Sequence, residues 1–237
     1  MPRFPAVLCL AVALTACSSS QTFVIRGDGS GTMTLHVEVS RLLHDYIVSL
    51  GEVSGTSAAP SGDRIFDQEA IRKGFEAQPG VSVDSLSSPG PSVLDASLSF
   101  LSLSAIFAGT AGLGASQAVV LSESEGVKTL KIHLDRANYR QVAALFPLLQ
   151  APVLQSLGPQ VNEKVSNEDY LEMVRFAIGD DGPALVRKSF IVITIRPEGE
   201  IVSQSGGTPA SGAVVFRVPL LRLLVLDSPL DFSVSFR

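Results

Sequence analysis

Two segments of the chain alternate between apolar and polar residues on either side of a glycine turn. The first, residues 23–39, turns at Gly27-Asp28-Gly29-Ser30-Gly31 and carries its apolar positions at Phe23, Ile25, Met33, Leu35, Val37 and Val39. The second, residues 118–134, turns at Glu125-Gly126 and continues with Leu130, Ile132 and Leu134. A period of two around a turn is typical of a β-hairpin with one apolar face. The apolar face of each hairpin must pack against other elements, so the chain is expected to form a layered fold built on a sheet.

Helical periodicity follows each hairpin and appears twice more. Ser40 and Asp135 stand at the cap positions after the two hairpins, Asp67 begins another helix, and Ser166 begins a fourth with a capping-box pattern that ends at Gly179. The predicted helices cover residues 41–50, 67–78, 136–146 and 166–178, with Gly51, Pro79-Gly80, Pro147 and Gly179 as their stops.

The remaining apolar runs predict strands over residues 81–87, 93–101, 186–195, 201–204, 213–218 and 230–236, and Pro219-Leu220 begins either a short helix or another strand. Strand runs mixed with helices, without regular βαβ alternation, predict an α+β fold: a mostly antiparallel, curved sheet built from hairpins with about four helices packed on it. No linker divides residues 22–237, so we expect a single domain there.

The charge balance excludes some classes of protein. A net charge of −5 and a pI near 5.2 lack the basic surface of a nucleic-acid-binding protein. Residues 96–122 contain no charged side chain, which is compatible with a membrane span. Serines and glycines interrupt this run, so we interpret it as a buried strand followed by a loop of small residues.

The amino terminus has the order of a secretory signal peptide. Arg3 precedes an apolar run over residues 4–14 that is too short to span a bilayer. Leu14-Thr15-Ala16-Cys17 then matches the lipobox, and in this respect the chain resembles bacterial lipoproteins. The resemblance implies that residues 1–16 are removed and that Cys17 becomes a lipidated first residue, carrying a diacylglyceryl thioether and usually an amide-linked acyl chain such as palmitate. We expect residues 17–21 to form a short lipidated tether to the membrane.

Two further expectations follow from this amino terminus. Cys9 would leave with the signal peptide and Cys17 would be acylated, so the mature chain would contain no free thiol and no disulfide. Ser18 follows the lipidated residue where retention signals of enteric lipoproteins carry Asp, which resembles an outer-membrane address. The sequence therefore predicts a lipid-anchored protein of the bacterial cell envelope on the periplasmic or surface face, more specifically of the outer membrane.

No catalytic constellation is recognisable. His36 and His133 lie at polar positions of strands, His44 lies on a helix, and none belongs to a metal-binding motif. The glycine-rich turn at residues 27–31 lacks the lysine of a phosphate-binding loop, and no serine stands in a hydrolase motif. We expect a non-enzymatic protein without catalytic residues, metal or cofactor.

The two hairpin-helix units also align with each other at an offset of 95 residues. Ser40 and Arg41, for example, fall on Asp135 and Arg136. A true duplication and two independent hairpins that each feed a capped helix both explain this match.

The order of a lipobox, a hairpin, an α+β body and the late run Pro219-Leu220-Leu221 is similar to LppM-type bacterial lipoproteins. That resemblance implies a non-enzymatic envelope protein that handles lipid. Two functions remain open. The first is a module that binds a lipid or another apolar ligand, with residues 98–121 lining the site. The second is a scaffold lipoprotein that docks another envelope protein through a sheet edge or apolar patch.

Overall fold

The computed structural model describes residues 17–54, 63–103, 118–140, 158–159 and 164–237. The strands are β1 (Ser18–Ile25), β2 (Gly31–Glu38), β3 (Val81–Gly90), β4 (Val93–Phe100), β5 (Val119–Ser124), β6 (Val127–Leu134), β7 (Phe190–Pro197), β8 (Ile201–Ser205), β9 (Thr208–Ala210), β10 (Ala213–Pro219) and β11 (Leu230–Phe236). The helices are α1 (Arg41–Ser54), α2 (Gln68–Glu76), α7 (Asn167–Ile178), α8 (Gly182–Lys188) and α9 (Leu220–Val225).

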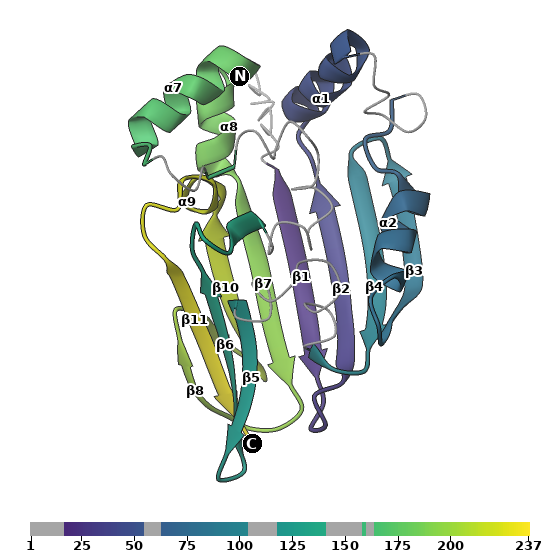
Figure 1. The fold of residues 1–237 in the computed structure, drawn as a ribbon, viewed down its shortest axis with the longest axis vertical. Coiled ribbons are helices and arrows are strands. Elements are labelled where there is room, and N and C mark those ends of the chain that lie inside the picture. Colours follow the sequence, from purple (N-terminus) through teal and green to yellow (C-terminus); the bar gives the residue numbers. More distant parts are fainter. Residues whose placement is uncertain (1–16, 55–62, 104–117, 141–157, 160–163) are drawn as a thin grey trace, which may run out of the picture.

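These strands form two sheets. A seven-stranded sheet has the order β3-β4-β2-β1-β7-β10-β9, and a four-stranded sheet has the order β5-β6-β11-β8. Within the described strands β1 and β7 pair in parallel and every other pairing is antiparallel. The predicted α+β class with mostly antiparallel pairing is confirmed, with the strands distributed over two layers (Figure 1).

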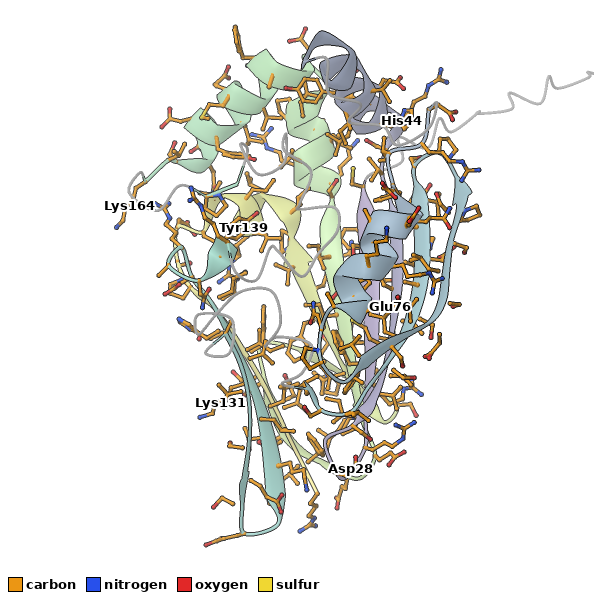
Figure 2. The ribbon with its side chains drawn as sticks, turned by 45° about the vertical axis from the view of Figure 1, so that its right-hand side comes forward. Asp28, His44, Glu76, Lys131, Tyr139 and Lys164 are labelled. Atoms are coloured by element: carbon orange, nitrogen blue, oxygen red, sulfur yellow. The ribbon has the colours of Figure 1, made fainter. Side chains whose placement is uncertain are left out.

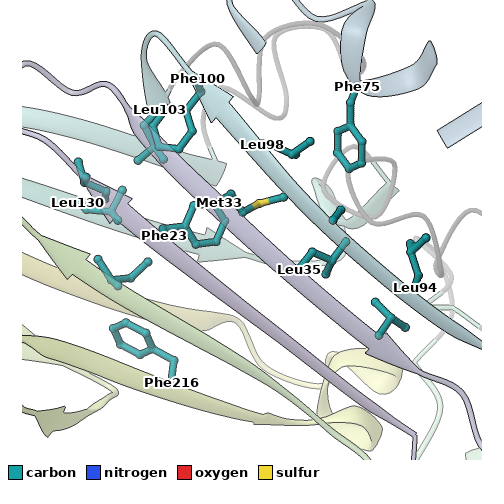
Figure 3. Packing of buried hydrophobic residues seen from close by; sticks show 14 of the residues in the cluster. Phe23, Met33, Leu35, Phe75, Leu94, Leu98, Phe100, Leu103, Leu130 and Phe216 are labelled. Atoms are coloured by element: carbon teal, nitrogen blue, oxygen red, sulfur yellow. The ribbon is translucent and has the colours of Figure 1, made fainter. Parts of the chain in front are cut away.

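The two sheets share one core. We call the buried side of the seven-stranded sheet its inner face, on which Leu35 of β2 and Leu98 of β4 lie (Figure 3). Phe216 of β10 meets Phe232 of β11 in the other sheet, with ring centroids 5.0 Å apart. Burial of these apolar side chains is the main source of stability, since the described residues contain no disulfide.

Helices gather at one end of the seven-stranded sheet. We call it the Cys17 end: β1 and β7 begin there and β2 and β10 finish there, with Ser18 paired to Glu38 and Phe190. Helix α1 follows β2, α8 leads into β7, α9 follows β10, and α7 contacts all three of these helices (Figure 1). Helix α2 instead packs beside β3 and places Phe75 in the core.

The predicted tether at residues 17–21 is wrong as a description of local structure. Ser18 to Gln21 form the first half of β1, and each of these residues pairs with β2 on one side and β7 on the other. Polar residues enter a central strand here because the two neighbouring strands supply partners for the backbone amides and carbonyls. Strand β1 begins directly after Cys17.

The predicted strand at residues 186–195 is wrong in its first part. Residues Gly182–Lys188 form α8, with Pro183 in the first turn and Arg187 and Lys188 in the last. Proline is well suited to a helix start, and basic residues suit a helix end. Gly51, expected to stop the first helix, lies inside α1.

Other local predictions are confirmed. Both hairpins form. Asp67 accepts a hydrogen bond from the backbone N–H of Ala70, and Ser166 accepts one from that of Asp169, so both residues cap helices as expected. Pro219-Leu220 begins the short helix α9, which was one of the two alternatives.

Most of the predicted helix at 136–146 and the loop at 104–117 lie outside the described residues. Among the helices that are described, none has the length and apolar content required to cross a bilayer.

Candidate functional site

Cys17 lies at the junction of β1 and α1. Cys17 is buried, with 5% of its surface exposed to solvent. The backbone N–H of Ser40 donates to Cys17 Sγ at 3.3 Å, and the thiol donates to Ser40 Oγ at 3.6 Å. The hydroxyl oxygen of Ser40 also accepts a hydrogen bond from the backbone N–H of Leu43. The same residue therefore caps α1 and hydrogen-bonds to Cys17. A thioether at this sulfur would keep an acceptor for the Ser40 N–H and would lose the weak thiol donor, and the attached group would need room beside a buried residue.

Cys17 lies directly before a central strand of the seven-stranded sheet. The next residue, Ser18, is already paired with Glu38 and Phe190 in the middle of the seven-stranded sheet. A group attached to Cys17 would therefore start at the Cys17 end, close to α1.

Gln21 is a long polar side chain that is buried on the inner face of the seven-stranded sheet. It is 2% exposed and lies between Leu35 of β2 and Ile193 of β7 in the register of the sheet. Within the described part of the chain, its Nε2 has no hydrogen-bond partner. An unpaired buried amide costs about 1–3 kcal/mol, so an acceptor at this point would be favourable.

Buried positions alternate along β1 from Cys17 through Ser19 and Gln21 to Phe23 and Ile25. The inner side of this strand is thus polar near the Cys17 end and apolar farther on. Gln21 lies roughly 13 Å along the strand from Cys17, at about 3.3 Å per residue. The sequence analysis missed Gln21 because it was assigned to the tether.

The apolar run at 98–121, expected to line a ligand site, is described only at its ends. Leu98, Phe100 and Leu103 are buried in the main core cluster, and Ala118 is buried at the start of the second hairpin. Residues 104–117 lie outside the described part of the chain.

Each of the three histidines contacts at least one oxygen of an aspartate. His36 Nδ1 lies 2.6 Å from Asp95 on β4, and His133 Nδ1 lies 2.7 Å from Asp231 on β11. His44 contacts the carboxylate of Asp45 and the backbone carbonyl of Asp63. In the residues that the structure describes, no group of three His, Cys, Asp or Glu side chains could hold a metal ion.

Two of these histidines have shifted pKa values. The hydrogen bond to Asp231 is the main reason why the pKa of His133 is raised, and Asp135, 3.5 Å away, adds to it. Burial lowers the pKa of His44, but the hydrogen bonds to Asp45 and Asp63 more than offset this, so the net shift is upward.

The glycine-rich turn closes the first hairpin, as the sequence predicted. Asp28 accepts the backbone N–H of Ser30 at 2.9 Å, and Gly29 adopts a positive φ of 85°. Hydrogen bonding from Ser30 lowers the pKa of the Asp28 carboxyl. This turn lies at the end of the molecule opposite His44 and α1 (Figure 2).

Large apolar side chains are exposed at a few described positions. On α7, Phe176 is 94% exposed and Met173 is 50% exposed. Leu101, just after β4, is 76% exposed, and Val120 and Val202 project from the edge strands β5 and β8.

Comparisons with known proteins give one similar structure. No family model and no curated protein matches the sequence. The folded domain of the LppM protein of Mycobacterium tuberculosis, determined by NMR, matches 94% of this chain and 90% of its own, with 11% sequence identity and a TM-score of 0.42. The neighbour is a protein of the type that the sequence resembles. A TM-score of 0.42 at 11% identity does not assign a function to the chain.

Proposed function

We propose that the protein is a lipoprotein of the bacterial cell envelope, anchored through acylated Cys17, whose body binds a lipid or another apolar ligand on its inner face. The observation that carries the proposal is the junction at Cys17. The lipobox cysteine lies directly before a central strand, and its sulfur lies at the amino terminus of α1.

The anchor holds the body against the membrane. Each buried CH₂ of an acyl chain contributes about 0.8 kcal/mol, so the two or three chains of a lipoprotein give lasting attachment. With β1 beginning at Ser18, no linker separates the chains from the sheet. The proposed location is the periplasmic or surface face of the outer membrane.

Gln21 supports the ligand-binding part of the proposal. The inner face offers apolar side chains around one buried amide whose N–H donors lack a described partner. Sites for apolar ligands combine these two properties, because the apolar surface supplies affinity and a few polar groups fix orientation. The ligand that we propose is an acyl chain with an oxygen acceptor, such as an ester carbonyl or hydroxyl, that would accept a hydrogen bond from Gln21.

The alternative is a scaffold that docks another envelope protein. Its support is the pair of exposed valines on the edge strands of the four-stranded sheet, Val120 of β5 and Val202 of β8. Edge strands with exposed apolar side chains are suited to strand addition by a partner.

The test uses a form without covalent lipid. The mature chain with Cys17→Ser, exported in the native host behind a cleavable signal peptide, is purified and its bound lipids are identified by mass spectrometry. Gln21→Leu is compared with Gln78→Leu, because Gln78 is also buried, at 4% exposure, and its Oε1 also lacks a partner among the described residues. Gln78 lies between α2 and β3, away from β1.

We expect a stoichiometric lipid in the parent and in Gln78→Leu, and a reduced amount in Gln21→Leu. Loss of the unpaired amide should also raise the stability of the ligand-free Gln21→Leu protein. Absence of lipid from all three forms would contradict ligand binding and favour the scaffold function.

A further inference from the structure

Helix α7 carries an apolar face that no other described element covers. Met173 and Phe176 are three residues apart, so they lie on one side of the helix, and Phe176 is 94% exposed. The opposite side of α7 is buried through Tyr170, Leu171 and Val174. The helix is therefore held to the body by one face while it offers two large apolar side chains on the other.

Helix α7 lies at the Cys17 end of the sheet (Figure 1). Helix α7 contacts α1, α8 and α9, all of which lie at the Cys17 end of the sheet (Figure 1). A bilayer reached from Cys17 without a linker lies against this end. Exposed apolar side chains elsewhere differ in this respect, since Leu101 follows the last residue of β4 at the opposite end.

We propose that Phe176 and Met173 insert into the interfacial region of the bilayer beside the acyl anchor and so fix the orientation of the body on the membrane. This inference rests on the proposed anchoring through Cys17. Two apolar side chains alone bind a bilayer weakly, whereas the anchor keeps them at a high effective concentration at its surface. Together they would give a second point of contact and prevent free rotation about the anchor.

The charges around Phe176 determine which lipids to use. Arg175 forms ion pairs with Glu172 and with Asp180, which leaves one negative charge among the three groups. The first turn of α7 adds two further acidic residues, so the charge beside the apolar face is net negative. We therefore expect contact with the bilayer to depend on apolar insertion and to require no anionic lipid. Vesicles of zwitterionic phosphatidylcholine are the appropriate membrane.

The sequence contains no tryptophan, so the fluorescence of a single introduced indole can be measured without a background from other tryptophans. Phe176→Trp and Leu101→Trp each introduce a single indole at an exposed apolar position, one at the Cys17 end and one at the other end. The full-length lipidated variants are reconstituted into phosphatidylcholine vesicles that contain bromine-labelled acyl chains, which quench indoles in contact with them. Flotation of the vesicles and far-ultraviolet circular dichroism check attachment and folding.

We expect the fluorescence of Phe176→Trp to be blue-shifted and quenched on the brominated vesicles, and that of Leu101→Trp to be unchanged. A floating protein whose Phe176→Trp indole is no more quenched than the Leu101→Trp indole would overturn the insertion and leave the anchor standing. That result would assign the α7 face to a protein partner or a second copy. A folded protein that does not float with the vesicles would overturn the anchor, and the insertion with it.

Discussion

Ser18, the residue after the lipobox cysteine, lies directly opposite Phe190 in the parallel pairing of β1 with β7. The strand that follows Cys17 thus lies between β2, the next strand along the chain, and β7, which begins about 170 positions later. In the proposed lipoprotein, no linker would separate the anchor from the sheet, and this joint would determine which end of the molecule faces the membrane.

The pairing of residues 18–21 can be tested by insertion. One glycine inserted between Ser20 and Gln21 breaks the register of β1 with both neighbours, and we expect it to destabilise the protein by roughly 1–3 kcal/mol. The same insertion between Cys17 and Ser18 leaves every pairing intact and serves as the control. Urea denaturation of the non-acylated chain measures both. Equal stabilities would mean that residues 18–21 form a tether after all.

The inner face contributes most of the stability. Leu98 is fully buried, whereas Leu101, three residues later, is 76% exposed. We expect Leu98→Ala to cost about 2–5 kcal/mol and Leu101→Ala to change the free energy of unfolding by no more than about 0.5 kcal/mol. Denaturation with urea distinguishes them, and a cost below about 1 kcal/mol for Leu98→Ala would contradict a packed core at β4.

The ion pair of His133 with Asp231 should make stability depend on pH. Because the folded pKa of His133 is raised, its contribution is complete below the unfolded value of about 6.5 and is lost as the pH rises through the folded value. We expect His133→Asn to destabilise the protein more at about pH 5.5 than at about pH 8.5, with a difference of about 1 kcal/mol or less because the pair is exposed.

Asp231→Asn provides the control for that measurement. In its presence the pH-dependent effect of His133→Asn should shrink, since the main cause of the shift is gone. A pH-dependent effect that is the same with and without Asp231 would contradict the assigned cause.

The sequence predicted those elements whose signals are local. Hairpin turns at Gly29 and Gly126 and helix caps at Asp67 and Ser166 are determined by a few neighbouring residues, and the structure contains all of them. A period of two along β2 and β6 likewise reports which side of each strand is buried.

The errors lie where distant segments decide the structure. Nothing in Ser18-Ser19-Ser20-Gln21 marks a central strand, because the pairing that makes it one comes from β2 and β7. Val186 was assigned to a strand from its apolar neighbours, although Pro183 starts a helix that contains it. The candidate site was missed for the same reason, since Gln21 becomes buried only when both neighbouring strands are in place.

The most direct measurement for the central proposal is the mass of the amino-terminal peptide of the protein purified from membranes of its native host. We expect this peptide to begin at Cys17 and to carry a diacylglyceryl group on the sulfur, while Cys17→Ser abolishes labelling by a palmitate analogue. A membrane-derived amino-terminal peptide that begins at another residue, or that carries Cys17 with a free thiol, would contradict the anchor and the orientation deduced from it.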